Sequence, residues 1–91
     1  MDIDKVKSYL ESYEKFECNT KQLSRNINGI IKSKFIKILP VYTSSQVQNI
    51  LIFSGFSTGP SILTGAITGY DIDENKITIN CSHQTIELFG L

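Results

Sequence analysis

Hydrophobic residues near the start of the chain recur at the spacing of an α-helix. Between residues 4 and 16 they fall at intervals of three and four, while lysine, serine and glutamate occupy the opposite face. Asp2 or Asp4 can accept hydrogen bonds from the free N–H groups of a first helical turn. The pattern predicts an amphipathic helix over residues 4–16, with its apolar face formed by Ile3, Val6, Tyr9, Leu10, Tyr13 and Phe16.

A second run of helical spacing lies between residues 20 and 39. Thr20 can cap its start, and Pro40 disfavours helical geometry in the residue before it, so this helix should end by Leu39. Residues 1–38 are therefore predicted to form a helical hairpin. The apolar positions of the second helix would be Leu23, Ile27, Ile30, Ile31, Phe35 and Ile38.

After Pro40 the pattern changes to short runs rich in β-branched residues, separated by turn residues. Gly65 and Gly69 within one of these runs indicate strong bending or a close approach of backbones. The acidic segment 71–76 is a predicted turn. Strands are predicted at residues 41–43, 47–53, 62–70, 76–81 and 85–89.

These elements predict a single α+β domain over residues 1–91. The helical hairpin would pack on a small, strongly bent antiparallel sheet or a five-stranded barrel formed by residues 41–91. A chain of 91 residues with 41% hydrophobic and 20% charged residues can bury a modest core. This size leaves little room for an enclosed pocket, so we expect binding at a surface or between subunits.

Charge is balanced overall but segregated along the chain. Residues 1–37 carry eight basic and five acidic groups, whereas residues 38–91 carry one basic and four acidic groups. The zero net charge predicts no binding to duplex DNA or to an anionic membrane. The 33 residues between Lys37 and Asp71 carry no charge, but proline, glycine and polar residues interrupt them too densely for a membrane helix.

The first residues lack the basic and apolar regions of a secretory signal, so we expect a cytoplasmic protein. In that compartment Cys18 and Cys81 would be reduced thiols, and burial is the usual fate of such residues.

Two features are candidate partner contacts. Lys21, Arg25 and Lys32 would align on the outer face of the second predicted helix, and no acidic residue between Cys18 and Tyr70 neutralises them. This basic stripe is either a docking site for phosphates or an acidic partner, or an ordinary solvated helix face. Phe56 lies in the predicted loop 54–61, where an exposed aromatic ring could contact a partner.

Motifs for catalysis or metal binding are incomplete. The spacing Asp71-x-Asp73-x-Asn75 opens like a calcium loop, but Lys76 replaces the glycine that such a loop requires. His83 is the only histidine, which is too few for two-histidine phosphoester chemistry. Cys18, Cys81 and His83 could together supply three zinc ligands, but a lone histidine beside a strand end is more often a surface or hydrogen-bonded residue. We predict no enzymatic activity, no metal and no cofactor.

One segment resembles a known family. Residues 63–79 read Leu63-x-Gly65-x-Ile67-x-x-Tyr70-Asp71-x-Asp73-Glu74-Asn75-x-Ile77-x-Ile79, which is similar in spacing to the first signature of Sm-like proteins, the LSm and Hfq group. The resemblance implies an N-terminal helix, a bent five-stranded barrel of the Sm-like or SH3-like kind, ring assembly by strand pairing, and a loop that binds single-stranded RNA.

The binding loop matches that family only at Asp71 and Asn75. Asp73 and Glu74 stand where the family has an aromatic residue and methionine, and carboxylates there would repel phosphate. Phe89-Gly90 replaces the arginine-glycine pair of the second signature.

The sequence thus favours a non-enzymatic interaction module that acts through a protein partner or self-assembly, such as a small intracellular regulator or inhibitor. The segment 47–70 has no charged residue to protect a strand edge, so we expect a homo-oligomer. The alternative is an Sm-like ring that binds single-stranded RNA through Asp71, Asn75 and the basic stripe.

Overall fold

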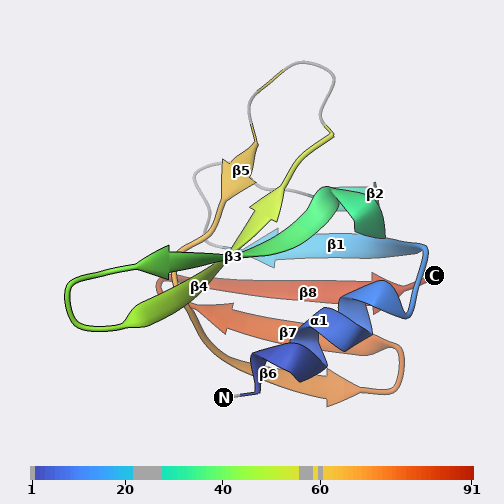
Figure 1. The fold of residues 1–91 in the computed structure, drawn as a ribbon. Coiled ribbons are helices and arrows are strands. Elements are labelled where there is room, and N and C mark those ends of the chain that lie inside the picture. The colour runs from blue at the N-terminus through green and yellow to red at the C-terminus, as the bar shows by residue number, and fades with distance from the viewer. Residues whose placement is uncertain (1, 22–27, 56–58, 60) are drawn as a thin grey trace.

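The protein is described by a computed structural model that covers residues 2–21, 28–55, 59 and 61–91. One helix is followed by two antiparallel sheets (Figure 1). The elements are α1 (Ile3–Glu11), β1 (Lys15–Lys21), β2 (Asn28–Lys32), the 3-10 turn η1 (Ser33–Phe35), β3 (Ile36–Tyr42), β4 (Val47–Phe53), β5 (Ile62–Leu63), β6 (Ile67–Asp73), β7 (Lys76–Cys81) and β8 (Gln84–Gly90).

The first helix begins where the sequence predicts and ends five residues early. The carboxylate of Asp2 accepts a hydrogen bond from the backbone N–H of Asp4, which caps the helix start. At the other end, the backbone N–H of Ser12 donates to the carbonyl of Tyr9. Phe16 lies in β1 instead of the helix, and its ring packs against Tyr9 and Tyr13 with centroid distances of 6.0 and 5.6 Å.

The second predicted helix and the helical hairpin are wrong. The described residues between 15 and 42 form β1, β2, η1 and β3. The apolar positions also fit a strand. In a strand, neighbouring residues point to opposite faces of the sheet, so Ile31 can face the core while Ile30 faces solvent. Ile31 is buried beside Phe16, its partner across the strands, whereas Ile30 is 69% exposed.

The larger sheet has the order β2-β1-β8-β7-β6, and all of its pairs are antiparallel. Its inner face is covered by α1, which contributes Val6 and Leu10 to the core (Figure 1). The outer face is mainly polar, and Lys76 there pairs with Glu87 at 3.4 Å. The inner face is buried through Phe16, Cys18, Ile31, Ile67, Ile77, Ile79, Cys81, Ile86 and Leu88.

The smaller sheet has the order β3-β4-β5 and is built around a long hairpin. Ile36, Leu51 and Phe53 anchor one end of the hairpin in the core. At the other end Thr43 closes the turn, since its backbone N–H and hydroxyl both donate to the carbonyl of Gln46. The distal half of β3 and β4 projects away from the rest of the molecule (Figure 1).

The two sheets do not close into a barrel, so the barrel alternative is corrected. The predicted strand 62–70 is interrupted between β5 and β6, where Gly65 crosses from one sheet to the other. A side-chain carbon at Gly65 would lie 2.8 Å from the carbonyl oxygen of Ser82, whereas one at Gly69 would meet nothing within 4 Å. The expected close approach of backbones therefore occurs at Gly65 alone.

The strands predicted at 47–53 and 76–81 are confirmed with the same bounds, as β4 and β7. The predicted strand 41–43 starts earlier, because β3 already begins at Ile36. The acidic turn is shorter than predicted, since β6 runs to Asp73 and β7 starts at Lys76. Within the described residues, no helix is both long enough and apolar enough to span a bilayer.

Candidate protein-interaction surfaces

The outward-facing side of the smaller sheet is apolar. Along β3 and β4 the core side carries the pairs Ile36–Phe53 and Ile38–Leu51, so the residues between them point outward. Leu39 faces Ile50 on this outer side, and Leu63 of β5 faces Ile52. Leu39 is 44% exposed and Leu63 is 56% exposed. We call this surface the aliphatic face, and it consists of Leu39, Val41, Ile50, Ile52 and Leu63. Lys37, which faces Ile52, borders it at the base of the hairpin.

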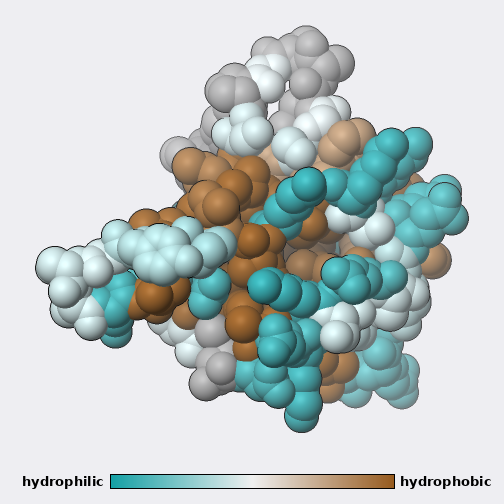
Figure 2. Space-filling view, viewed as in Figure 1, coloured by the Kyte–Doolittle hydropathy of each residue, from teal (hydrophilic) through white to brown (hydrophobic). Residues whose placement is uncertain are grey.

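The tip of the hairpin is also apolar on its opposite side. Tyr42 and Val47 face each other there, and they are 77% and 54% exposed. Both residues lie on the same face of the hairpin as Leu51 and Phe53, which are buried at its base. At the tip, no described element covers this face. Figure 2 shows hydrophobic surface where β3 and β4 leave the core and hydrophilic surface over α1.

One edge of the hairpin is open and the other is blunted. Leu51 bonds toward the β5 side, where its carbonyl accepts from the N–H of Thr64 and its N–H donates to the Thr64 hydroxyl. The backbone groups of Asn49 and Val47, two and four residues before Leu51, point in the same direction as those of Leu51. Because β5 does not extend that far, their N–H groups have no described partner strand there. On the outer edge of β3, Pro40 has no N–H to donate.

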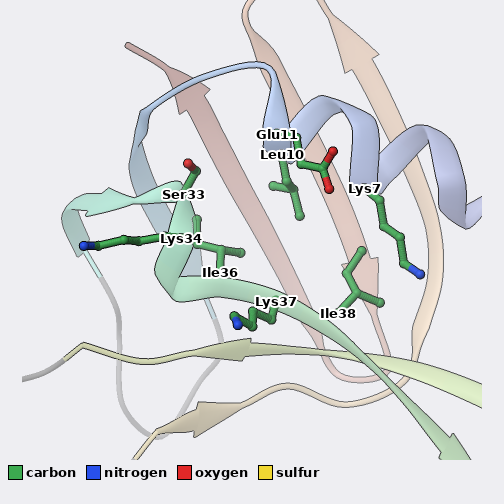
Figure 3. Close-up of a pocket in the computed structure, with 8 residues that line it drawn as sticks. All are labelled: Lys7, Leu10, Glu11, Ser33, Lys34, Ile36, Lys37 and Ile38. Atoms are coloured by element: carbon green, nitrogen blue, oxygen red, sulfur yellow. The ribbon is translucent and has the colours of Figure 1, made fainter.

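A groove lies between α1 and the start of β3, with a volume of about 480 Å³. Its apolar side chains are Leu10, Ile36 and Ile38, and its cationic side chains are Lys7, Lys34 and Lys37 (Figure 3). Glu11 and Ser33 complete the lining. We call this feature the lysine groove. All three lysines are exposed, while Leu10 and Ile36 are buried.

The lysines of the groove come from three separate elements. Lys7 extends from α1 at one end of the groove, whereas the Lys34 side chain runs from η1 away from the other lining side chains (Figure 3). The Lys34 ammonium also lies 5.1 Å from the centre of the Phe35 ring. In the part of the chain that the structure describes, Lys76 and Glu87 form the one ion pair, so none of the three lysines is neutralised by a salt bridge there.

The predicted basic stripe is not a helix face. Lys21 ends β1 and Lys32 ends β2, so they belong to neighbouring strands. Arg25 and Phe56 lie outside the described residues. The sequence reasoning missed the lysine groove, although the excess of basic residues before residue 38 was a signal for it.

The two residues carried over from the Sm-like signature lie at the junction of β6 and β7. Asp71 is exposed on β6. The Asn75 side-chain amide donates to the Gly90 carbonyl at 3.3 Å, and the Gly90 N–H donates to the Asn75 carbonyl at 2.6 Å. Asn75 therefore ties the turn to the end of β8, which is a structural task. RNA binding by these residues stays a prediction.

The thiols and the histidine do not form a shared site. Cys18 and Cys81 are free and buried, and burial raises the pKa of the Cys18 thiol to about 12. His83 is exposed in the turn between β7 and β8, with a φ of 70°. The described residues contain no group of three or more histidine, cysteine or acidic side chains that could hold a metal ion.

Comparison with known proteins gives no relationship. No protein-family model, no curated protein and no solved structure matches this chain.

Proposed function

We propose that this protein is a non-enzymatic interaction module that works by self-assembly, and that a second copy of the chain covers the aliphatic face. The observation that carries the proposal is a projecting hairpin whose distal half is uncharged and whose outward aliphatic side chains are exposed or half-buried. Exposed apolar side chains that adjoin one another on a protein surface are typical of contact sites. Burying them removes apolar area from water, which favours association.

The charge pattern favours a second copy as the occupant. No residue from 38 to 70 is charged, so the distal parts of two hairpins can approach without repulsion between like charges, and Lys37 at the base is the one charged residue of β3 and β4. The edges of the hairpin also matter. Pro40 blunts the outer edge of β3, and the uncovered edge of β4 spans only Val47 to Ile50 before β5 begins. This arrangement favours a closed assembly through the face over an open chain of strands.

The experiment compares oligomeric states by light scattering coupled to gel filtration at tens of micromolar protein. We expect the wild type to have a mass that is a multiple of 10.2 kDa. The double variant Leu39→Lys/Leu63→Lys places charge on the aliphatic face and should be monomeric. The control is Ile30→Lys, which adds charge at an exposed position on the larger sheet and should leave the assembly intact.

Circular dichroism of each variant establishes that it is folded. A monomeric wild type would refute self-assembly. Dissociation caused equally by Ile30→Lys would show that the aliphatic face is not the interface.

A further inference from the structure

We propose that the lysine groove binds an acidic segment of a different protein, in which aliphatic side chains alternate with carboxylates. This inference concerns a different partner from that of the proposed self-assembly, and the groove borders the aliphatic face at Lys37, which faces Ile52. The lysine groove combines apolar side chains at its base with lysines around it. The lysines favour an acidic ligand, and the apolar side chains favour a ligand with aliphatic groups.

The charges select an acidic ligand. Lys7, Lys34 and Lys37 outnumber Glu11, and the described residues supply no salt bridge to any of the three lysines. Because Lys7, Lys34 and Lys37 come from three different elements, an extended ligand can meet them with separate carboxylates. Complementary charges of this kind speed association and select the partner.

The apolar lining selects a peptide over a nucleic acid. Ile38 is half-buried and offers an accessible aliphatic side chain beside the buried Leu10 and Ile36, and none of the eight lining residues is aromatic. Proteins that bind single strands of RNA or DNA stack bases on aromatic side chains, and the groove provides no such platform. An aliphatic side chain of a peptide can instead pack against these three residues while its neighbours reach the lysines.

The acidic turn of a second copy fits this groove less well. On β6, Ile72 pairs with Ile77 on the core side of the sheet and lines a depression beside Tyr9 of α1. Asp71 and Asp73 point to the opposite side of the sheet. The turn therefore cannot present its carboxylates and its isoleucine together, and a separate protein is the better occupant.

The test measures fluorescence anisotropy with a labelled peptide in which Glu and Leu alternate. We expect saturable binding that weakens as salt increases. The variant Lys7→Glu/Lys34→Glu reverses two exposed charges of the groove and should weaken binding by roughly tenfold or more. The matched control is Lys5→Glu/Lys15→Glu, which makes the same change in net charge outside the groove and should alter the affinity by less than about twofold.

Three further arms decide the nature of the ligand. A polyglutamate peptide should bind more weakly, because it has no side chain for the apolar lining. A single-stranded RNA of equal charge should also bind more weakly. The variant Asp71→Asn/Asp73→Asn should not change the affinity for the peptide, whereas a clear gain would mean that the turn of a second copy fills the groove.

Backbone amide shifts in nuclear magnetic resonance spectra locate the peptide independently. We expect the largest changes at Leu10, Ile36 and Ile38. No binding of the peptide, an equal loss in both charge-reversal variants, or tighter binding of polyglutamate or RNA would overturn the proposal. Because the peptide does not depend on the aliphatic face, these outcomes are separate from the failure of self-assembly.

Discussion

The two antiparallel sheets of this protein differ in the polarity of their solvent-facing sides. The outer face of the larger sheet is mainly polar and includes the Lys76–Glu87 pair. The outer face of the smaller sheet has Leu39, Ile50 and Leu63 at comparable positions. An antiparallel sheet commonly buries one face and solvates the other. The smaller sheet departs from that rule.

This difference in polarity bears on which outer face would associate with another protein chain. Charged side chains on a sheet discourage association with other chains, and beyond Lys37 the outer face of the smaller sheet has none. Both sheets contribute buried residues to the core, and under our proposal, of the two outer faces, only that of the smaller sheet contacts another molecule. The four changes below test this division of roles.

The largest effect should separate the two sides of the smaller sheet. Leu51 is fully buried, so Leu51→Ala should lower the free energy of unfolding by about 2–5 kcal/mol through lost packing and a cavity. Leu39 lies on the neighbouring strand and faces outward, so Leu39→Ala should change it by no more than about 0.5 kcal/mol. Urea unfolding of the two variants measures both values, and equal losses would contradict the division.

A second change tests the join between the sheets. Gly65→Ala would place a carbon against the backbone of Ser82, which has to move, and should cost about 1–3 kcal/mol. The control is Gly69→Ala, because the added carbon meets nothing within 4 Å there. Thermal unfolding compares them, and a stable Gly65→Ala variant would mean that the two sheets are not held this closely.

A third change examines the buried side of the larger sheet through pH. Desolvation by burial raises the pKa of the Cys18 thiol from 9.0 to about 12. The folded protein therefore disfavours the thiolate. This contribution to stability is fully present below about pH 9 and is lost as the pH rises from there toward 12.

The free energy of unfolding should accordingly fall above pH 9. Cys18→Ala should make that decline shallower, since it removes one of the groups that ionise on unfolding. Burial also raises the pKa of the Cys81 thiol and of the Tyr9 hydroxyl, so part of the decline should remain. Denaturant titrations across this pH range measure the slope. A slope that Cys18→Ala leaves unchanged would show that the thiol is not shielded from water.

The smallest effect is expected on the polar face of the larger sheet. Lys76 and Glu87 are both partly exposed, so Lys76→Gln should lower stability by no more than about 1 kcal/mol. High salt should reduce the difference from the wild type further. The mass in light scattering should stay unchanged, because neighbouring polar residues still cover this face. A larger assembly would show that this one charge protects the larger sheet.

Much of the second half of the fold could be predicted from the sequence. The strands at 47–53 and 76–81 have runs of β-branched residues between clear turn residues, and local preference and final structure agree there. The start of α1 was also predictable, since Asp2 caps it as expected. The candidate site was harder to predict, because the lysine groove brings together α1, η1 and β3, whose contacts are not local.

The sequence by itself determined the first helix, the alternation that makes the later strands, and the uncharged segment that becomes the projecting hairpin. The tertiary structure decided the state of residues 28–42. Their apolar spacing fits both a helix and a pair of strands, and the strand state is stabilised by partners elsewhere in the chain, as in the pairing of Ile31 with Phe16 and of Ile36 with Phe53. Such distant pairing contributes free energy that no local pattern contains, so tertiary contacts override the local helical preference.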